Sequence, residues 1–236
     1  LAIESSSVTA SAAILTDNTV TAEYSTNFKQ THSQTLLPMI DSICTMTGTP
    51  VESIDLIAVS AGPGSFTGLR IGSATGKGIG LALGKPVVSV PTLEGLAMNV
   101  SGTDRIVCPI MDARRGQVYT GIYKFEETEM KTIKPQCIMM IDELIKELDT
   151  IKESVMFLGD GVDVHKQLID DIMDTKHYYA PASMNRHKAS TLGTIAEIYY
   201  KNGKTETAKE HKPEYLRLSQ AERELKAKMK EAKSDN

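Results

Sequence analysis

The chain has 236 residues, of which 41% are hydrophobic, and a formal net charge of −4. This length allows one large domain or two small ones with a hydrophobic core. No basic stripe is concentrated outside the last residues, which argues against a protein that grips nucleic acid alone, because phosphate neutralisation supplies most of such an affinity.

Cysteines, histidines and apolar runs exclude several classes of protein. Cys44, Cys108 and Cys137 are odd in number and far apart, which is typical of reduced, buried thiols and not of disulfides or zinc sites. The five histidines have no metal-ligand spacing. No run of eighteen apolar residues and no charged-then-apolar leader is present, so we expect a soluble, cytoplasmic protein.

The first elements are strands. Apolar stretches over 1–3, up to 14–15 and over 20–24, with a turn at 17–18, predict an antiparallel meander. An amphipathic helix follows over about 33–47. Ser33 or Thr35 is the predicted N-cap, and Pro38 places the helix start shortly upstream, because proline is tolerated in the first turn.

A strand–loop–helix–strand unit comes next. Residues 54–60 form an apolar strand, and the loop 61–67 leads into a helix that ends near Leu83, before the strand 87–90. This order predicts a βαβ unit with a parallel strand pair, as in α/β proteins.

A weaker break at 101–104 precedes a second half. There we expect a hairpin of 106–111 and 118–125 around Asp112-Ala113-Arg114-Arg115-Gly116. After it we expect a helix over 141–148, a strand over 155–158 and a turn at 159–161. Two further helices are expected, one from 162 and one over 190–200. Residues 222–236 are almost wholly Glu, Lys, Arg and Ala, which predicts a solvated or frayed helix with no binding role.

The helix over 68–83 carries a glycine stripe. Glycines recur at every fourth position, and a step of four residues advances about 40° around a helix, so they share one side. Each interior glycine costs about 1 kcal/mol relative to alanine, so close backbone approach is the expected gain. The neighbour is either this protein's own sheet or a helix of another chain, and the pattern alone favours neither.

The loop before this helix, G-P-G-S-F-T-G at 62–68, also has two interpretations. A glycine-rich turn at a helix N-terminus can cradle phosphate through its N–H groups. The P-loop and dinucleotide patterns are both absent, which favours a structural turn.

Six segments together resemble one family. They are L-A-I-E-S-S-S at 1–7, H-S-Q-T-L-L-P at 32–38, G-P-G-S-F-T-G-L-R-I-G at 62–72, S-V-P-T-L-E-G-L-A at 89–97, D-A-R-R-G-Q-V-Y at 112–119 and P-E-Y-L-R at 213–217. The chain resembles the TsaB family, the non-catalytic paralogue of TsaD in the bacterial complex that makes threonylcarbamoyladenosine beside the tRNA anticodon. The resemblance is dense over 1–125 and thin over 126–210.

The resemblance implies an α/β fold of the actin-like, Hsp70-like and sugar-kinase-like class, with two lobes that are each a mixed β-sheet with helices. We expect residues 1–101 to form the N-terminal lobe with the partner-binding helices, 102–221 a smaller, divergent lobe, and 222–236 a charged tail.

Comparison with TsaD predicts the loss of catalysis. Its metal-binding segment resembles N-H-L-E-G-H, and here Thr92 and Leu96 replace the two histidines. Glu94 remains, and we expect it to be solvated or capping. Asp112 to Gly116 stand where TsaD has a phosphate-facing turn, and we interpret them as a salt-bridged hairpin turn in preference to an ATP site. Glu4 is then a structural remnant, and no metal, cofactor or catalytic residue is predicted.

As the resemblance implies, the function is that of a scaffold or activating subunit required for threonylcarbamoylation of tRNA. It would heterodimerise with a TsaD-like paralogue, recruit a TsaE-like P-loop ATPase, use a threonylcarbamoyl-adenylate made by TsaC, and reach tRNA only through the complex. The helices at 33–47 and 68–83 would form a four-helix bundle with TsaD or, in a homodimer, with a second copy. The predicted interface residues are Leu36, Leu37, Ile40, Ile43, Arg70, Gly72, Gly76 and Gly80.

The alternative is an enzyme, either a metal- or ATP-dependent transferase or a metallopeptidase. It needs a metal constellation or a phosphate loop, and the sequence offers neither pattern.

Overall fold

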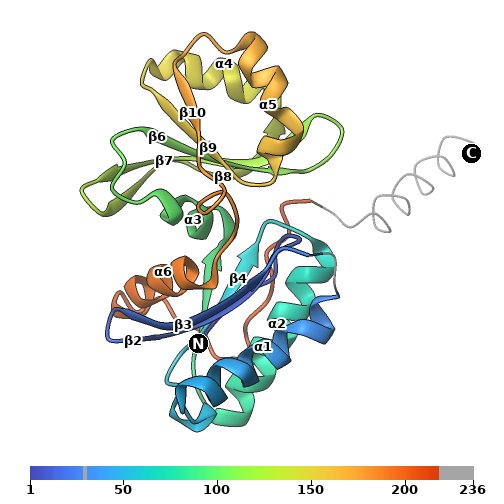
Figure 1. Ribbon diagram of the computed structural model, residues 1–236, viewed down its shortest axis with the longest axis vertical. Helices are drawn as coiled ribbons and strands as arrows, with labels where there is room; N and C mark the ends of the chain where they lie inside the picture. The colour runs from blue at the N-terminus through green and yellow to red at the C-terminus, as the bar shows by residue number, and fades with distance from the viewer. Residues whose placement is uncertain (29–30, 218–236) are drawn as a thin grey trace, which may run out of the picture.

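The computed structural model describes residues 1–28 and 31–217. Two five-stranded mixed sheets, each covered by helices, form two lobes stacked along the long axis of the molecule (Figure 1). This is the predicted two-lobed α/β fold. No helix in the described ranges is long and apolar enough to cross a membrane.

The first sheet has the strand order β3-β2-β1-β4-β5. Its strands are β1 (Ala2–Glu4), β2 (Ala10–Thr16), β3 (Thr19–Thr26), β4 (Ile57–Gly62) and β5 (Val87–Pro91). Strands β1 to β3 are the predicted antiparallel meander, and β4 and β5 pair in parallel across the predicted βαβ unit.

Alternation along the strands gives this sheet two apolar faces. Ile3, Ile57 and Val59 contact α1 (His32–Thr47) and α2 (Phe66–Leu83), whereas Ala2 and Ala58 contact α6 (Ala189–Lys201) on the opposite face. The sequence analysis assigned α6 to the second lobe. That assignment is wrong, since the buried Leu192 and Ala196 pack on the first sheet and complete its core.

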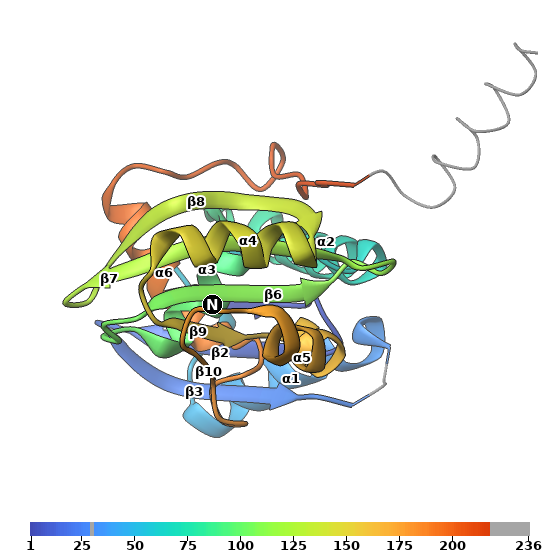
Figure 2. The ribbon, with the colours of Figure 1, turned by 90° about the horizontal axis from the view of Figure 1, so that it is seen from above.

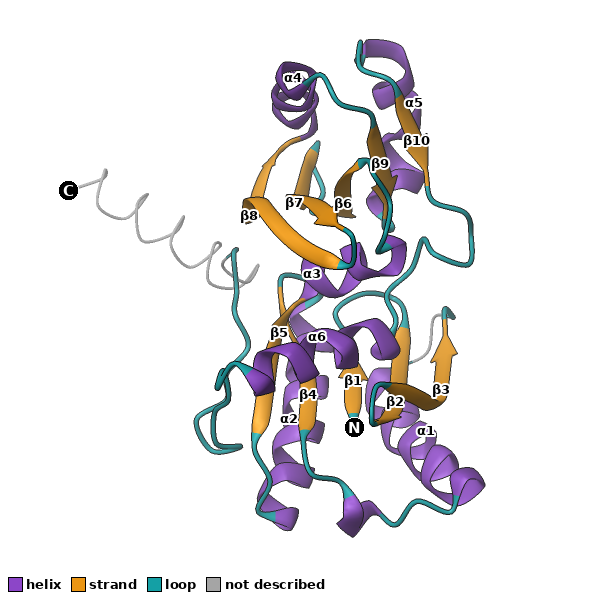
Figure 3. Cartoon of the chain, turned by 90° about the vertical axis from the view of Figure 1, so that its left-hand side faces the viewer, coloured by secondary structure: helices purple, strands orange, loops and turns teal. Residues whose placement is uncertain are grey.

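The second sheet has the order β10-β9-β6-β7-β8. Helices α4 (Ile141–Ile151) and α5 (Gly161–Ile172) lie over its outer face (Figure 2), and the short helix α3 (Thr92–Ala97) lies between the two sheets (Figure 3). The strands of this sheet are β6 (Ile106–Asp112), β7 (Gln117–Glu126), β8 (Glu129–Met140), β9 (Val155–Leu158) and β10 (His177–Tyr179). Outside the two sheets, short 3₁₀ helices span Val51–Ser53 and Met98–Val100.

Strands β8 and β10 and helix α3 were not predicted. β8 is an edge strand with lysines and Pro135, and most of its residues are only partly buried, so it lacks the apolar alternation by which strands are recognised. β10 is only three residues long. Lysines and proline are typical of edge strands because they oppose further pairing.

Two details of α1 also differ from expectation. Thr31 is the N-cap, without a side-chain hydrogen bond, while Ser33 and Thr35 lie inside the helix. Pro38 is in the second turn and not the first. Gln34, whose carbonyl loses its helical donor, and Pro38 are both exposed, so the proline lies on the solvent side of the helix, where a missing hydrogen bond costs least.

The C-terminal strap, residues 205–217, returns to the first lobe. Glu206 pairs with Val87 of β5 through two backbone hydrogen bonds of 2.9 and 3.0 Å, which adds an antiparallel bridge at the edge of the first sheet. Of the three cysteines, only Cys108 is fully buried, and Cys44 and Cys137 are half-buried free thiols.

Candidate functional site

The glycine stripe of α2 faces this protein's own sheet. A Cβ placed on Gly76 would lie 2.5 Å from Val59 Cγ1, and one on Gly72 would collide with Ser5 Oγ. At Gly80 the obstacle is Ala208 of the C-terminal strap, at 2.9 Å. The close approach is therefore intramolecular, and the prediction that Gly72, Gly76 and Gly80 contact a partner helix is wrong.

Most of the predicted apolar interface residues of α1 also face this protein's own core. Leu36, Ile40 and Ile43 are at most 4% exposed and belong to the core of the first lobe. They support the helix from inside and offer no surface to a partner. Leu37 is 56% exposed and stays available for a contact.

A second stripe on α2 points away from the sheet. Arg70, Ala74, Gly78 and Leu81 recur at steps of three or four residues and are exposed, and a Cβ on Gly78 would meet nothing within 4 Å. Because α1 and α2 lie on one face of the sheet, their exposed sides point the same way. We call Leu37, Arg70, Ala74, Gly78 and Leu81 the outer face.

Sequence reasoning missed Ala74 and Gly78. The signal was present, because Gly78 is out of register with the glycines at every fourth position and therefore lies on a different side of the helix.

The positions at which the resemblance implied loss of metal-binding histidines are in the core. Thr92 and Leu96 are fully buried in α3, between the two sheets. Glu94 accepts a 2.6 Å hydrogen bond from the Tyr199 hydroxyl, and burial raises the pKa of its carboxyl. The expectation that Glu94 is solvated or capping is wrong, since it anchors α6 to α3. Within residues 1–28 and 31–217, no three His, Cys, Asp or Glu side chains gather as a metal site would require.

Glu4 is a buried acid at the end of β1. Its Oε1 accepts hydrogen bonds from the Ser6 N–H and hydroxyl at 2.6 and 2.5 Å. Burial raises its pKa to about 7, against the effect of these hydrogen bonds. His32, the first residue of α1, places Nε2 2.8 Å from the Ser7 carbonyl oxygen, so it fixes the same loop from the other side.

A cleft of about 650 Å³ lies between the lobes. The Ser6–Ser7 loop, the 63–67 loop, the β6–β7 hairpin and the end of the C-terminal strap line it. Ser65 caps α2 by accepting from the Gly68 N–H at 3.2 Å, and its own N–H donates to the Ser6 carbonyl at 2.6 Å. The Ser65 hydroxyl and N–H of the glycine loop are therefore hydrogen-bonded within the protein, as expected of a structural turn.

The β6–β7 hairpin is not the salt-bridged turn that we predicted. The Arg114 N–H donates to Asp112 Oδ1 at 2.9 Å, but the structure records no ion pair for the Arg114 or Arg115 side chain in the described ranges. Backbone hydrogen bonds form the turn, and both arginines are exposed at its tip.

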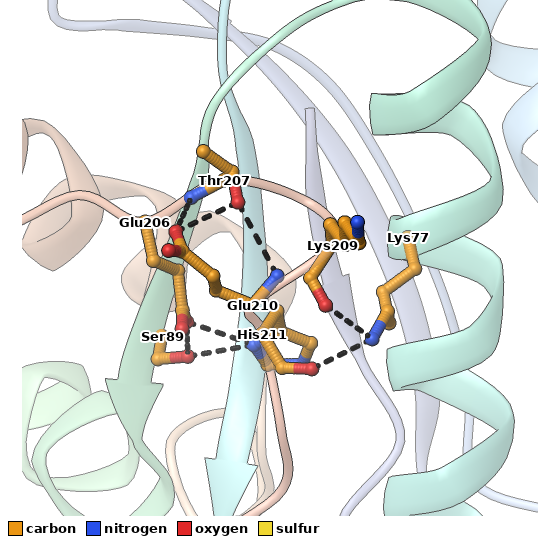
Figure 4. A network of polar contacts seen from close by, with 7 residues as sticks. All are labelled: Lys77, Ser89, Glu206, Thr207, Lys209, Glu210 and His211. Atoms are coloured by element: carbon orange, nitrogen blue, oxygen red, sulfur yellow. Dashed lines mark hydrogen bonds and ion pairs between the residues drawn. The ribbon is translucent and has the colours of Figure 1, made fainter.

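The C-terminal strap brings a histidine and an acid, five residues apart, to a serine of β5 that is distant in the sequence (Figure 4). His211 Nδ1 lies 2.8 Å from Ser89 Oγ and 2.9 Å from Glu206 Oε1, and the Ser89 hydroxyl donates to the same carboxylate. In a catalytic triad the serine and the acid bind opposite ring nitrogens. Here both use Nδ1, and Nε2 is buried with no partner among the described residues, so this cluster fastens the strap and lacks the arrangement of a triad.

Comparisons with known proteins agree with this geometry. A model of the TsaD family, described as tRNA N6-adenosine threonylcarbamoyltransferase, matches residues 19–225. The tRNA threonylcarbamoyladenosine biosynthesis protein TsaB of Bacillus subtilis is 37% identical over 94% of this chain and 95% of its own length. The chain belongs to the TsaB family.

Further TsaB relatives support this. The TsaB protein of Escherichia coli is 32% identical over 97% of this chain and 98% of its own length. A Pseudomonas aeruginosa structure, described as an uncharacterised protein with similarity to peptidase YEAZ, superposes with a TM-score of 0.76 at 26% identity, covering 91% of this chain and 97% of that one. The actin-like fold is thereby confirmed, and the chain has a role in tRNA threonylcarbamoyladenosine biosynthesis.

Proposed function

We propose that this chain is a non-catalytic scaffold subunit that binds a TsaD-like catalytic paralogue through the outer face. The observation that carries the proposal is the combination of exposed apolar side chains with small residues on one side of α1 and α2. Leu37 and Leu81 are 56% and 60% exposed, and Ala74 and Gly78 leave room for a second backbone. Exposed apolar surface of this kind is typical of a protein interface.

The buried residues of the same helices have a supporting role. Leu36, Ile40 and Ile43 fix α1 on the sheet, and the inward glycines seat α2. A rigid helix pair loses little conformational entropy when it binds, which favours a stable complex. Of the interface residues predicted from the sequence, Leu37 and Arg70 remain as direct contacts.

Other parts of the proposal rest on family membership. In the complex we place a TsaE-like P-loop ATPase beside the two paralogues, with tRNA and the threonylcarbamoyl-adenylate handled by the assembly, in the cytoplasm. Without its paralogue, the chain pairs its outer face with a second copy around a twofold axis.

The absence of catalysis is supported by the residues at the two candidate centres. Thr92 and Leu96 supply no imidazole, and the Ser89 cluster has the wrong ring nitrogen. The alternative of a transferase or peptidase would need another constellation.

Reconstitution tests the proposal. The chain, its TsaD-like paralogue and the ATPase from one genome are mixed with tRNA and the adenylate donor, with each protein omitted in turn. We expect modification only in the complete mixture and a stable complex of this chain with the paralogue. Modification by this chain alone, or modification that does not depend on it, would overturn the proposal.

A further inference from the structure

The tip of the β6–β7 hairpin has an unusual backbone. Arg114, Arg115 and Gly116 all have positive φ, at 66°, 59° and 74°. The Gln117 N–H donates to the Arg114 carbonyl at 3.2 Å, which makes Arg115 and Gly116 the central residues of a tight turn. The left-handed conformation crowds the Cβ of arginine against its own backbone, so glycine, asparagine and aspartate are the usual choices there.

The turn between β2 and β3 offers an internal comparison. It has the same positive φ values, 49° and 63°, and it is made by Asp17 and Asn18, which tolerate them. Glu127 and Lys152 also have positive φ, at 56° and 58°, but among the described residues two adjacent long side chains in this conformation occur only at Arg114 and Arg115. Such a pair of backbone outliers is grounds for a functional hypothesis.

The side chains of the two arginines indicate what their function is. Arg114 and Arg115 are exposed, and their guanidinium groups have no recorded contact in the described chain. The other four described arginines are engaged: Arg70 with Phe66 and Tyr215, Arg105 with Tyr178, Arg186 with Asp163, and Arg217 with the Ala113 carbonyl.

Positive charge gathers at this end of the cleft. Arg114 and Arg217 both line it, and Arg217 reaches the residue that precedes Arg114. The rings of Phe66 and Tyr215 also line the cleft with their centroids 4.6 Å apart, the Arg70 guanidinium covers the Phe66 ring at 4.0 Å, and Tyr215 is 39% exposed.

Acidic residues also face the cleft. Asp112 accepts from the Arg114 N–H and lies 3.7 Å from His165, and Asp160 accepts from the Asp112 N–H at 3.3 Å. Glu214 lies 3.5 Å from the Gln136 amide. These carboxylates line the cleft, whereas Arg115 stands outside it at the tip. An anion would therefore meet the tip from outside the cleft.

We propose that Arg114 and Arg115 bind backbone phosphates of the single-stranded loop of tRNA. The inference rests on the role of this chain in tRNA modification. A guanidinium group matches phosphate geometry and donates two parallel hydrogen bonds. Exposed arginines that follow the backbone, together with aromatic rings on which bases stack, are usual in sites for single-stranded RNA, and the cleft next to this tip is lined by Phe66 and Tyr215. With a net charge of −4 the chain has little general attraction for RNA, so this contact positions tRNA within the complex.

The test is the double variant Arg114→Asn/Arg115→Asn in the full chain, assembled with the TsaD-like paralogue. Asparagine keeps the turn and removes two charges. Lys152→Asn is the control, because Lys152 is also an exposed cation at positive φ (58°) but lies at the end of α4, outside the cleft. A labelled anticodon stem-loop is titrated at several salt concentrations and followed by fluorescence anisotropy.

We expect the double variant to bind the stem-loop about tenfold more weakly. The slope of log K against log salt should decrease by about 1.4, which is the contribution of two phosphate contacts on a single strand. The Lys152→Asn complex should match the wild type. Gel filtration should show an intact complex, and the melting temperature of the double variant should be unchanged or higher, because asparagine suits the turn.

Three results would overturn the proposal: wild-type affinity and slope in the double variant, an equal loss in Lys152→Asn, or loss of the protein complex itself, which would make the arginines a protein contact. If the wild-type chain forms no complex with the paralogue, the proposed function fails separately. The same titration on the full chain alone then decides the RNA contact.

Discussion

Gly76 of α2 lies directly against Val59 of β4, so close that a Cβ on the glycine would be 2.5 Å from Val59 Cγ1. Two residues further along, Gly78 faces open space. The two glycines therefore differ in role: Gly76 allows the helix to pack closely on its sheet, and Gly78 leaves open space at the helix surface.

Alanine substitutions at these two positions should have opposite effects. At Gly76 the new methyl group overpacks the contact with Val59, and we expect a loss of about 1–3 kcal/mol in the free energy of unfolding. At Gly78 the gain in helix propensity should raise that free energy by up to about 1 kcal/mol. Urea denaturation of the two variants measures both. Equal midpoints would mean that the inward stripe is not tightly packed.

Glu4 should make stability depend on pH. Burial raises its pKa in the folded state to about 7, above the ordinary value of 4.5. As pH rises from about 4.5 to 7 the unfolded chain loses this proton first, so the contribution of Glu4 is present at low pH and is lost as pH passes 7. The difference is roughly 3 kcal/mol.

Glu4→Gln tests this effect, because glutamine keeps an acceptor for the Ser6 N–H and cannot ionise. The free energy of unfolding of the wild type, measured between pH 4.5 and 8, should fall relative to that of the variant. Parallel curves for the two proteins would show that Glu4 does not titrate in this range.

Lys77 should hold the C-terminal strap on α2. Its Nζ donates to the carbonyls of Lys209 and His211 at 3.1 and 2.9 Å (Figure 4). Lys77→Met keeps the apolar stem and removes both hydrogen bonds, so we expect amide hydrogen exchange over 206–211 to quicken by about tenfold. Lys85→Met is the control, since Lys85 pairs with Asp55, which is 89% exposed. Equal protection in Lys77→Met and Lys85→Met would contradict this role.

The elements with strong apolar periodicity were predictable from the sequence. The β4–α2–β5 unit, the first meander and the β6–β7 hairpin follow from local patterns that tertiary packing reinforces. Edge strand β8 was not predictable, because its lysines and proline serve to prevent pairing. The return of α6 to the first lobe is a long-range event that no local pattern encodes.

The candidate site, too, was predictable only in part. The resemblance in sequence pointed to α1 and α2 as the partner-binding helices, which stays a prediction. The inward and outward sides of α2 carry similar small residues, and only packing distinguishes Gly76 from Gly78. In the Ser89–Glu206–His211 cluster, Ser89 is more than a hundred residues from the other two, so sequence spacing could not reveal the cluster.

Binding of the TsaD-like paralogue to the proposed outer face of α1 and α2 is tested by the affinity of Gly78→Leu for that paralogue, measured by calorimetry and compared with the affinity of Gln167→Leu, an exposed position on α5. A leucine side chain at Gly78 should hold the partner helix away while leaving the fold intact, since no neighbouring element in residues 1–28 and 31–217 lies within 4 Å of a Cβ at this position. We predict binding weakened by about ten- to a hundredfold for Gly78→Leu and unchanged for Gln167→Leu. Wild-type affinity in a folded Gly78→Leu variant would contradict binding through the outer face.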